Sequence, residues 1–115
     1  MIDERQKASK ILEELLDYFF RNGVTDLNMS LNFQGDQVRI HVSGPCEKEP
    51  DDFNELHDLL NATRRPELEG YYYELLGSSV GYGELKLLGS LIDHAETQYE
   101  DQILSVTAYR LLHQS

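Results

Sequence analysis

The sequence predicts an α+β fold, a two-layer α/β sandwich whose four mostly antiparallel strands carry helices on one face. Three observations predict it: a helical apolar periodicity near the N-terminus, a pair of alternating segments after it, and a second such pair near the C-terminus. Short stretches with helical spacing lie between the two pairs, so the expected order is α-β-β-α-α-α-β-β. The length suits one domain over residues 1–115.

Residues 3–22 are predicted to form an amphipathic helix. Its apolar residues recur at the spacing of one helix face: Ala8, Ile11, Leu12, Leu15, Leu16, Phe19 and Phe20. Two pairs of opposite charge, each four residues apart, favour the same helix: Lys10 with Glu14, and Asp17 with Arg21. Gly23 suits the left-handed conformation that often ends a helix.

A β-hairpin is expected next, because apolar and polar residues alternate on both sides of Gly35-Asp36. A two-residue turn with glycine at its first central position fits this dipeptide. The turn then sets three apolar pairs on one face: Phe33–Val38, Leu31–Ile40 and Met29–Val42. The other face is polar, so we expect helices to cover one side of the sheet only.

Three helical segments and a second hairpin complete the prediction. Asp51 or Asp52 should cap a short helix that stops before Pro66. Residues 67–76 and 84–95 are expected to form two further helices. The closing strands are expected over 96–100 and 103–110, with a turn near Glu100-Asp101.

The composition and charge of the chain disfavour several classes of partner. The chain has 21 acidic against 10 basic residues and a net charge of −11, which disfavours nucleic-acid and membrane-surface partners. The charge suits either solubility or a basic protein partner. No apolar run is long enough to span a bilayer, and the first residues do not resemble a signal peptide. Because Cys46 has no second cysteine to pair with, a reducing cytoplasm is the expected location.

A glycine-rich turn over residues 77–83 precedes the predicted helix 84–95 and is the most informative functional feature. Free backbone N–H groups and a helix N-terminus together make an anion site, although such a turn is more often a loop before a helix. The spacing matches neither the P-loop nor the dinucleotide fingerprint. The candidate anion-binding or cofactor-binding residues are Ser78, Ser79, Gly81 and Gly83.

Other chemistry-bearing residues give weaker signals. Glu14 and Asp17 lie one helical turn apart and could hold a divalent ion or provide a base, while the simpler interpretation is two solvated carboxylates. The four histidines lack metal-ligand spacing, so we expect no metal site. Cys46 has no strong activating cation nearby. The run Tyr71-Tyr72-Tyr73 suits a contact surface.

With these elements in place, the chain resembles the histidine-kinase-like ATPase fold of the GHKL superfamily, and in size the anti-sigma-factor serine kinases. Glu14 to Tyr18 stands where that family has Glu-x-x-x-Asn on its first helix, and Arg21-Asn22-Gly23 resembles the end of that helix. Ser43-Gly44-Pro45 stands at the family's first glycine motif. Residues 81–93 resemble its second glycine box, which opens a helix and leads to two closing strands.

The resemblance implies ATP and magnesium, but three positions depart from it. Tyr18 replaces the magnesium-holding Asn, Ser43 stands at or near the adenine-reading Asp, and Glu84 brings a carboxylate into the glycine box. Glu14 matches the general base of the serine kinases. We therefore expect a non-catalytic regulatory or protein-interaction domain with no cofactor, in bacterial signalling, with a protein partner or as a homodimer. The alternatives are a divergent ATP-binding serine kinase that uses Glu14, and a small-anion sensor that uses the glycine turn.

Overall fold

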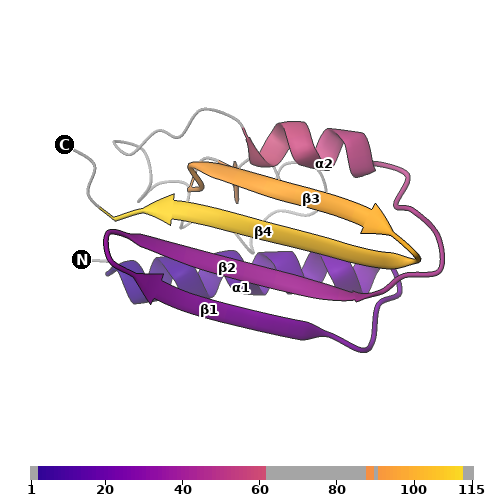
Figure 1. The fold of residues 1–115 in the computed structure, drawn as a ribbon, viewed down its shortest axis with the longest axis horizontal. Helices are drawn as coiled ribbons and strands as arrows, with labels where there is room; N and C mark the ends of the chain where they lie inside the picture. The colour runs from indigo at the N-terminus through magenta and orange to yellow at the C-terminus, as the bar shows by residue number, and fades with distance from the viewer. Residues whose placement is uncertain (1–2, 62–87, 90, 113–115) are drawn as a thin grey trace.

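The computed structural model describes residues 3–61, 88, 89 and 91–112. Its elements, in chain order, are α1 (Glu4–Arg21), β1 (Asn28–Gln34), β2 (Gln37–Pro45), α2 (Phe53–Leu60), β3 (His94–Glu100) and β4 (Ile103–Leu111). The four strands form one antiparallel sheet in the order β1-β2-β4-β3 (Figure 1). The predicted α+β class with a four-stranded antiparallel sheet is confirmed. No helix among these residues is long and apolar enough to cross a membrane.

The predicted order with four helices is wrong for the described residues, which contain two. The helix expected over 67–76 lies outside the described residues. Of the helix expected over 84–95, Leu88 and Gly89 are helical, Leu91 then bonds back to Leu88 in a tight turn, and β3 begins at His94. The last two residues of that helix are strand instead, because their main chain pairs with β4.

Helix α1 is confirmed, and both of its ends follow from local side chains. The Asp3 carboxylate accepts a hydrogen bond from the Gln6 main-chain N–H at 2.9 Å, and the Gln6 side chain accepts one from the Asp3 N–H at 3.0 Å. This reciprocal capping box satisfies two donors that the first turn leaves free. Gly23, with φ of 82°, takes the left-handed conformation just after the helix, as predicted.

The first hairpin has the predicted register, with Phe33 opposite Val38, Leu31 opposite Ile40, and Met29 opposite Val42. At its turn, Gly35 has φ of 62° whereas Asp36 does not have a positive φ, which agrees with glycine at the first central position.

The second hairpin turns at Asp101-Gln102, one residue later than predicted. Both residues have positive φ, of 54° and 61°. This is the conformation of the tight turns that suit the natural twist of paired strands.

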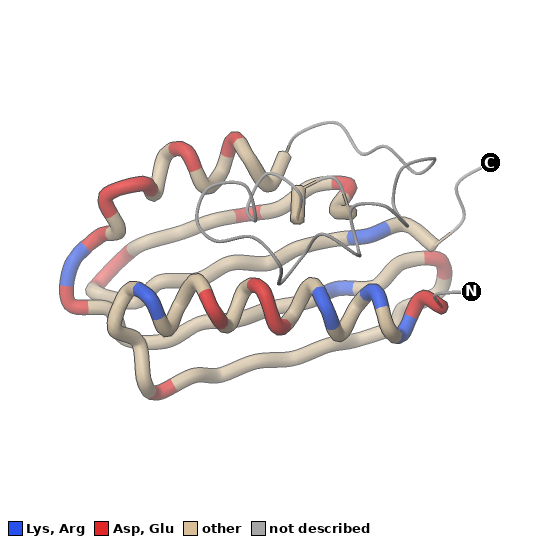
Figure 2. The backbone as a smooth tube through the Cα atoms, turned by 180° about the vertical axis from the view of Figure 1, so that it is seen from behind, with Lys and Arg blue, Asp and Glu red and all other residues tan. Residues whose placement is uncertain are grey.

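One face of the sheet forms the core, and α1 lies along it, packed against β2 (Figure 2). The buried side chains of the two central strands are Val38, Ile40, Val42, Leu104, Val106 and Ala108. Helix α2 lies beside β3 and adds Leu56 and Leu60 to the same core. In the described part of the chain, no helix covers the opposite face of the sheet, in line with the polar alternation of β1 and β2.

Candidate functional site

The glycine turn and the tyrosine run lie outside the described residues. This holds for all four candidate anion-binding residues, Ser78, Ser79, Gly81 and Gly83, and for Glu84 and Tyr71-Tyr72-Tyr73. The remaining predicted site residues lie on α1, at the end of β2, and in the loop that joins β2 to α2. The candidate site is therefore built from these three segments.

Glu14 and Asp17 contact different cations on α1. The Glu14 carboxylate lies 3.6 Å from Lys10 Nζ, and Asp17 lies 3.2 Å from Arg21 Nε. Glu14 is 8% exposed, so the interpretation of this residue as a solvated carboxylate is wrong. Among the described residues, no group of three or more His, Cys, Asp or Glu side chains could hold a metal ion.

Tyr18 joins α1 to the start of α2. Its side chain is 2% exposed, and its hydroxyl donates a hydrogen bond to Asp52 Oδ1 at 2.7 Å. Burial, and then the Asp52 hydrogen bond and charge, raise the pKa of Tyr18 far above its ordinary range, so the phenol remains a neutral donor. The ring also packs edge-on against Phe19. Tyr18 is therefore a fixed, buried part of the site.

Asp52 has a different role from the predicted one. It precedes α2 at the N-cap position, as expected, but its side chain makes no capping hydrogen bond. Its φ and ψ of −102° and 21° are not the extended conformation that a capping residue takes. The carboxylate bonds to Tyr18 instead, and so helix capping gives way to a contact between α1 and α2.

Ser43 and Gly44 occupy different faces of β2. Val42 is buried in the core, and alternation along the strand places Ser43 on the opposite, polar face, away from Glu14 and Tyr18. At Gly44, an added Cβ would lie 2.5 Å from the Asp26 carbonyl oxygen and 2.6 Å from Val24 Cγ1. The glycine is needed because the segment after α1 passes directly against β2.

Two cavities open beside this cluster, and acidic residues outnumber basic ones in both. The larger, about 680 Å³, contains Asp26 and Glu47 in its lining, with Lys48 as its cation. The smaller, about 260 Å³, is lined by Tyr18, Arg21, Asn22, Asp51 and Asp52. Figure 2 shows how acidic residues continue along the loop and α2. Such a lining disfavours a polyphosphate.

Cys46 closes the inner wall of the larger cavity. It is 4% exposed, and its thiol donates hydrogen bonds to the main-chain oxygens of Lys48 at 3.2 Å and Asn22 at 3.7 Å. The single S–H of Cys46 lies within hydrogen-bond reach of both main-chain oxygens. Cys46 holds the loop after β2 against the end of α1.

The described histidines lie apart from this cluster. His41 sits on the open face of the sheet, with Nδ1 2.8 Å from Thr107 Oγ1, and burial followed by the Arg39 charge lowers the pKa of its imidazole. The His94 ring stacks on Tyr109 at a centroid distance of 4.5 Å. His57 lies on α2, near Asn61 and Thr97. No two of these three histidines come together.

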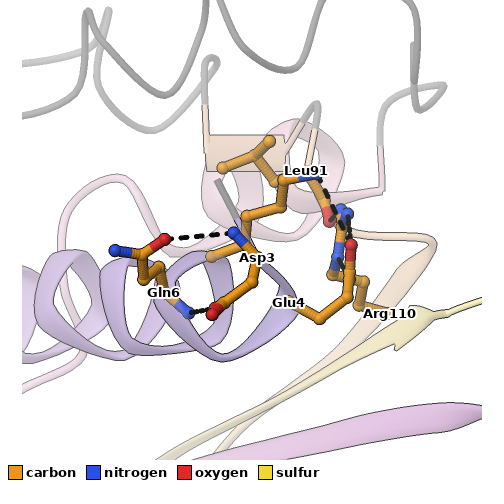
Figure 3. A network of polar contacts seen from close by, with 6 residues as sticks. Asp3, Glu4, Gln6, Leu91 and Arg110 are labelled. Carbon is orange, nitrogen blue, oxygen red and sulfur yellow. Dashed lines mark hydrogen bonds and ion pairs between the residues drawn. The ribbon is translucent and has the colours of Figure 1, made fainter. Parts of the chain in front are cut away.

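Arg110 is a buried cation that sequence analysis missed. It is 1% exposed, its Nε and Nη2 donate to the two oxygens of Glu4 at 2.8 and 3.2 Å, and its Nη1 donates to Leu91 O at 2.9 Å (Figure 3). A signal was present: Arg110 continues the alternating stripe of Leu104, Val106 and Ala108 on the core side of β4. A charged residue in an apolar stripe requires a buried partner.

No protein-family model matches the sequence, and no curated protein is significantly similar to it.

Proposed function

We propose that this chain is a non-catalytic regulatory domain, a degenerate form of the histidine-kinase-like ATPase type that acts through protein contacts. The observation that carries the proposal is the Tyr18–Asp52 hydrogen bond. When the chain is compared with the ATPase family it resembles, Tyr18 occupies the position of the magnesium-holding Asn. A buried, neutral phenol whose hydroxyl donates a hydrogen bond to a carboxylate is a poor substitute for an amide oxygen as a magnesium ligand.

Two other described residues that the resemblance assigns to nucleotide chemistry support the same proposal. Glu14 matches the general base, but it is buried, and its carboxylate lies 3.6 Å from Lys10 Nζ on the same helix. Ser43 has no carboxylate, and it lies on the face of the sheet opposite Glu14. These residues do not fit ATP and magnesium, and without metal and nucleotide no phosphoryl transfer follows.

The acidic lining of the neighbouring cavities also supports a domain that does not bind nucleotide. Asp26, Glu47, Asp51 and Asp52 line the two openings beside Tyr18, against Lys48 and Arg21. Like charges within a few ångströms repel strongly where water is partly excluded. A triphosphate would therefore meet an unfavourable potential here.

Thermal unfolding with and without millimolar Mg-ATP tests the proposal. A ligand at a hundred times its dissociation constant stabilises the native state by about 2.7 kcal/mol. We expect no stabilisation. A magnesium-dependent rise in melting temperature would instead favour the serine-kinase alternative, and a rise with inorganic phosphate alone would favour the anion sensor.

A further inference from the structure

The two edges of the sheet are protected very differently. At the β3 edge, the Asn61 side chain accepts a hydrogen bond from the Ala95 N–H at 2.9 Å and donates one to the Ala95 carbonyl at 3.0 Å. The amide thus takes the place of a neighbouring strand. Glu96 and Glu100 also place charges along β3, a common way to prevent pairing with another chain.

Among the residues that the structure describes, nothing protects the β1 edge in either of these ways. Its seven residues, Asn28–Gln34, include no charged side chain in a chain whose net charge is −11. Met29 and Phe33 are 47% and 44% exposed. In the described part of the chain, no hydrogen bond outside the β1–β2 ladder reaches the β1 main chain. A long, uncharged edge with exposed apolar side chains is a template for another strand.

The turn at Gly35-Asp36 determines which groups of β1 point outward. In a two-residue hairpin the closing pair, here Gln34 and Gln37, is hydrogen-bonded, so the even-numbered residues of β1 bond to β2. The odd-numbered residues then present their N–H and C=O groups to the outside. The same rule correctly places Ala95 outward on β3, where Asn61 binds it.

We propose that β1 pairs antiparallel with β1 of a second copy, about a twofold axis at Leu31, and joins the two sheets into one. The sequence of β1 is self-complementary about Leu31. Met29 of one copy faces Phe33 of the other on the helix side, and Ser30 faces Asn32 on the polar side. A twofold contact needs a surface that matches itself in this way.

The lack of charged residues on β1 suits a second copy as the occupant. Two chains of net charge −11 repel each other over most of their surface, so a contact between them is most favourable where charged residues are absent. Strand β1 is such a place, and it offers nothing to attract a basic or acidic partner. The inference names one protein partner for the proposed regulatory domain but rests on the sheet edge, independently of the loss of nucleotide chemistry.

Light scattering coupled to size exclusion tests the pairing. The wild-type chain should have twice the 13.3 kDa mass of one copy. The double variants M29K/F33K and M29E/F33E each place like charges opposite one another across the axis, and each should be monomeric. Mixed together, they place Lys opposite Glu and should recover the dimer.

A matched control separates pairing from general loss of exposed apolar area. Ile103 and Leu111 are exposed to a similar degree, 40% and 39%, but lie on the interior strand β4. The variant I103K/L111K should remain dimeric. A wild-type monomer at every concentration, or β1 variants that stay dimeric, would overturn the inference.

Amide hydrogen exchange on the unmodified chain gives a second test that needs no folded variant. Amides of Met29, Leu31 and Phe33 should lose protection on dilution, while those of Ser30 and Asn32 should keep it. Equal protection at high and low concentration would contradict the pairing. Neither result depends on Mg-ATP, so the failure of this inference and that of the proposed function are distinguishable.

Discussion

Arg110 and Glu4 are 106 residues apart in sequence and form a bidentate ion pair, with Nε 2.8 Å and Nη2 3.2 Å from the two carboxylate oxygens. The pair ties the first turn of α1 to the end of β4. The third contact of the guanidinium, to Leu91 O, fixes the segment that enters β3. One buried side chain thus holds three parts of the chain together (Figure 3).

Replacing Arg110 by Met should destabilise the fold. The variant leaves Glu4 and the Leu91 carbonyl without this donor, and breaking a buried pair costs about 3–5 kcal/mol. Because the Glu4 side chain is 36% exposed, water will partly replace the guanidinium, and we expect about 3 kcal/mol. Urea unfolding measures this. The control R5M removes an Arg that is 83% exposed and should change stability by less than about 0.5 kcal/mol. Equal effects of the two variants would contradict the structural role of Arg110.

The same pair predicts a pH dependence. The hydrogen bond and charge of Arg110 lower the pKa of Glu4 below its ordinary value of 4.5, against the opposing effect of burial. The unfolded chain then binds more protons than the folded one in this range. The stability from Glu4 is therefore complete above about pH 5 and is lost as the pH falls through the lowered pKa.

The variant E4Q should isolate this contribution. Its melting temperature should lie below that of the wild type at pH 7, and the difference should shrink towards pH 3. The control E13Q removes the same charge from a side chain that is 68% exposed. The difference in melting temperature between E13Q and the wild type should not shrink in this way between pH 7 and pH 3. A difference in melting temperature between E4Q and the wild type that stays constant from pH 7 to pH 3 would contradict this role of Glu4.

Gly44→Ala tests the close approach of the segment after α1 to β2. The added methyl would overlap the Asp26 carbonyl oxygen, which is main chain and has little freedom to move. Overpacking of this kind typically costs about 1–3 kcal/mol. Ser43→Ala, on the open face, should cost less than about 0.5 kcal/mol. Chemical denaturation of both variants measures the difference, and a Gly44→Ala variant as stable as Ser43→Ala would show that the approach is not tight.

Local patterns were enough to predict α1 and the first hairpin. The spacing of apolar residues, Gly23 and the Gly35-Asp36 turn act within a few residues of one another, and the register of β1 and β2 follows from them. The β3–β4 hairpin was predicted for the same reason. Its turn lies one residue away from the predicted place, because positive φ at Asp101 and Gln102 has no glycine signal.

Predictions failed where a distant partner decides the outcome. The helix expected to end at Ala95 gives way to β3, because the main chain at His94 pairs with Tyr109 of β4. The Asp52 side chain accepts a hydrogen bond from Tyr18, which lies 34 residues earlier, and does not cap α2. Arg110 finds its partner at the opposite end of the chain. The apolar stripe of β4 marks Arg110 as needing a buried partner, but in none of the three cases does a local window of sequence identify the partner.

The most direct test of the central claim is the melting temperature of the wild-type chain with and without saturating Mg-ATP. Tyr18 fills the metal position of the resemblance, and the nearby cavities are acidic, so we predict a change of less than about 1 °C. Binding at a hundredfold excess would raise the melting temperature on the order of 10 °C for a domain of this size. A magnesium-dependent rise of that order would contradict the account.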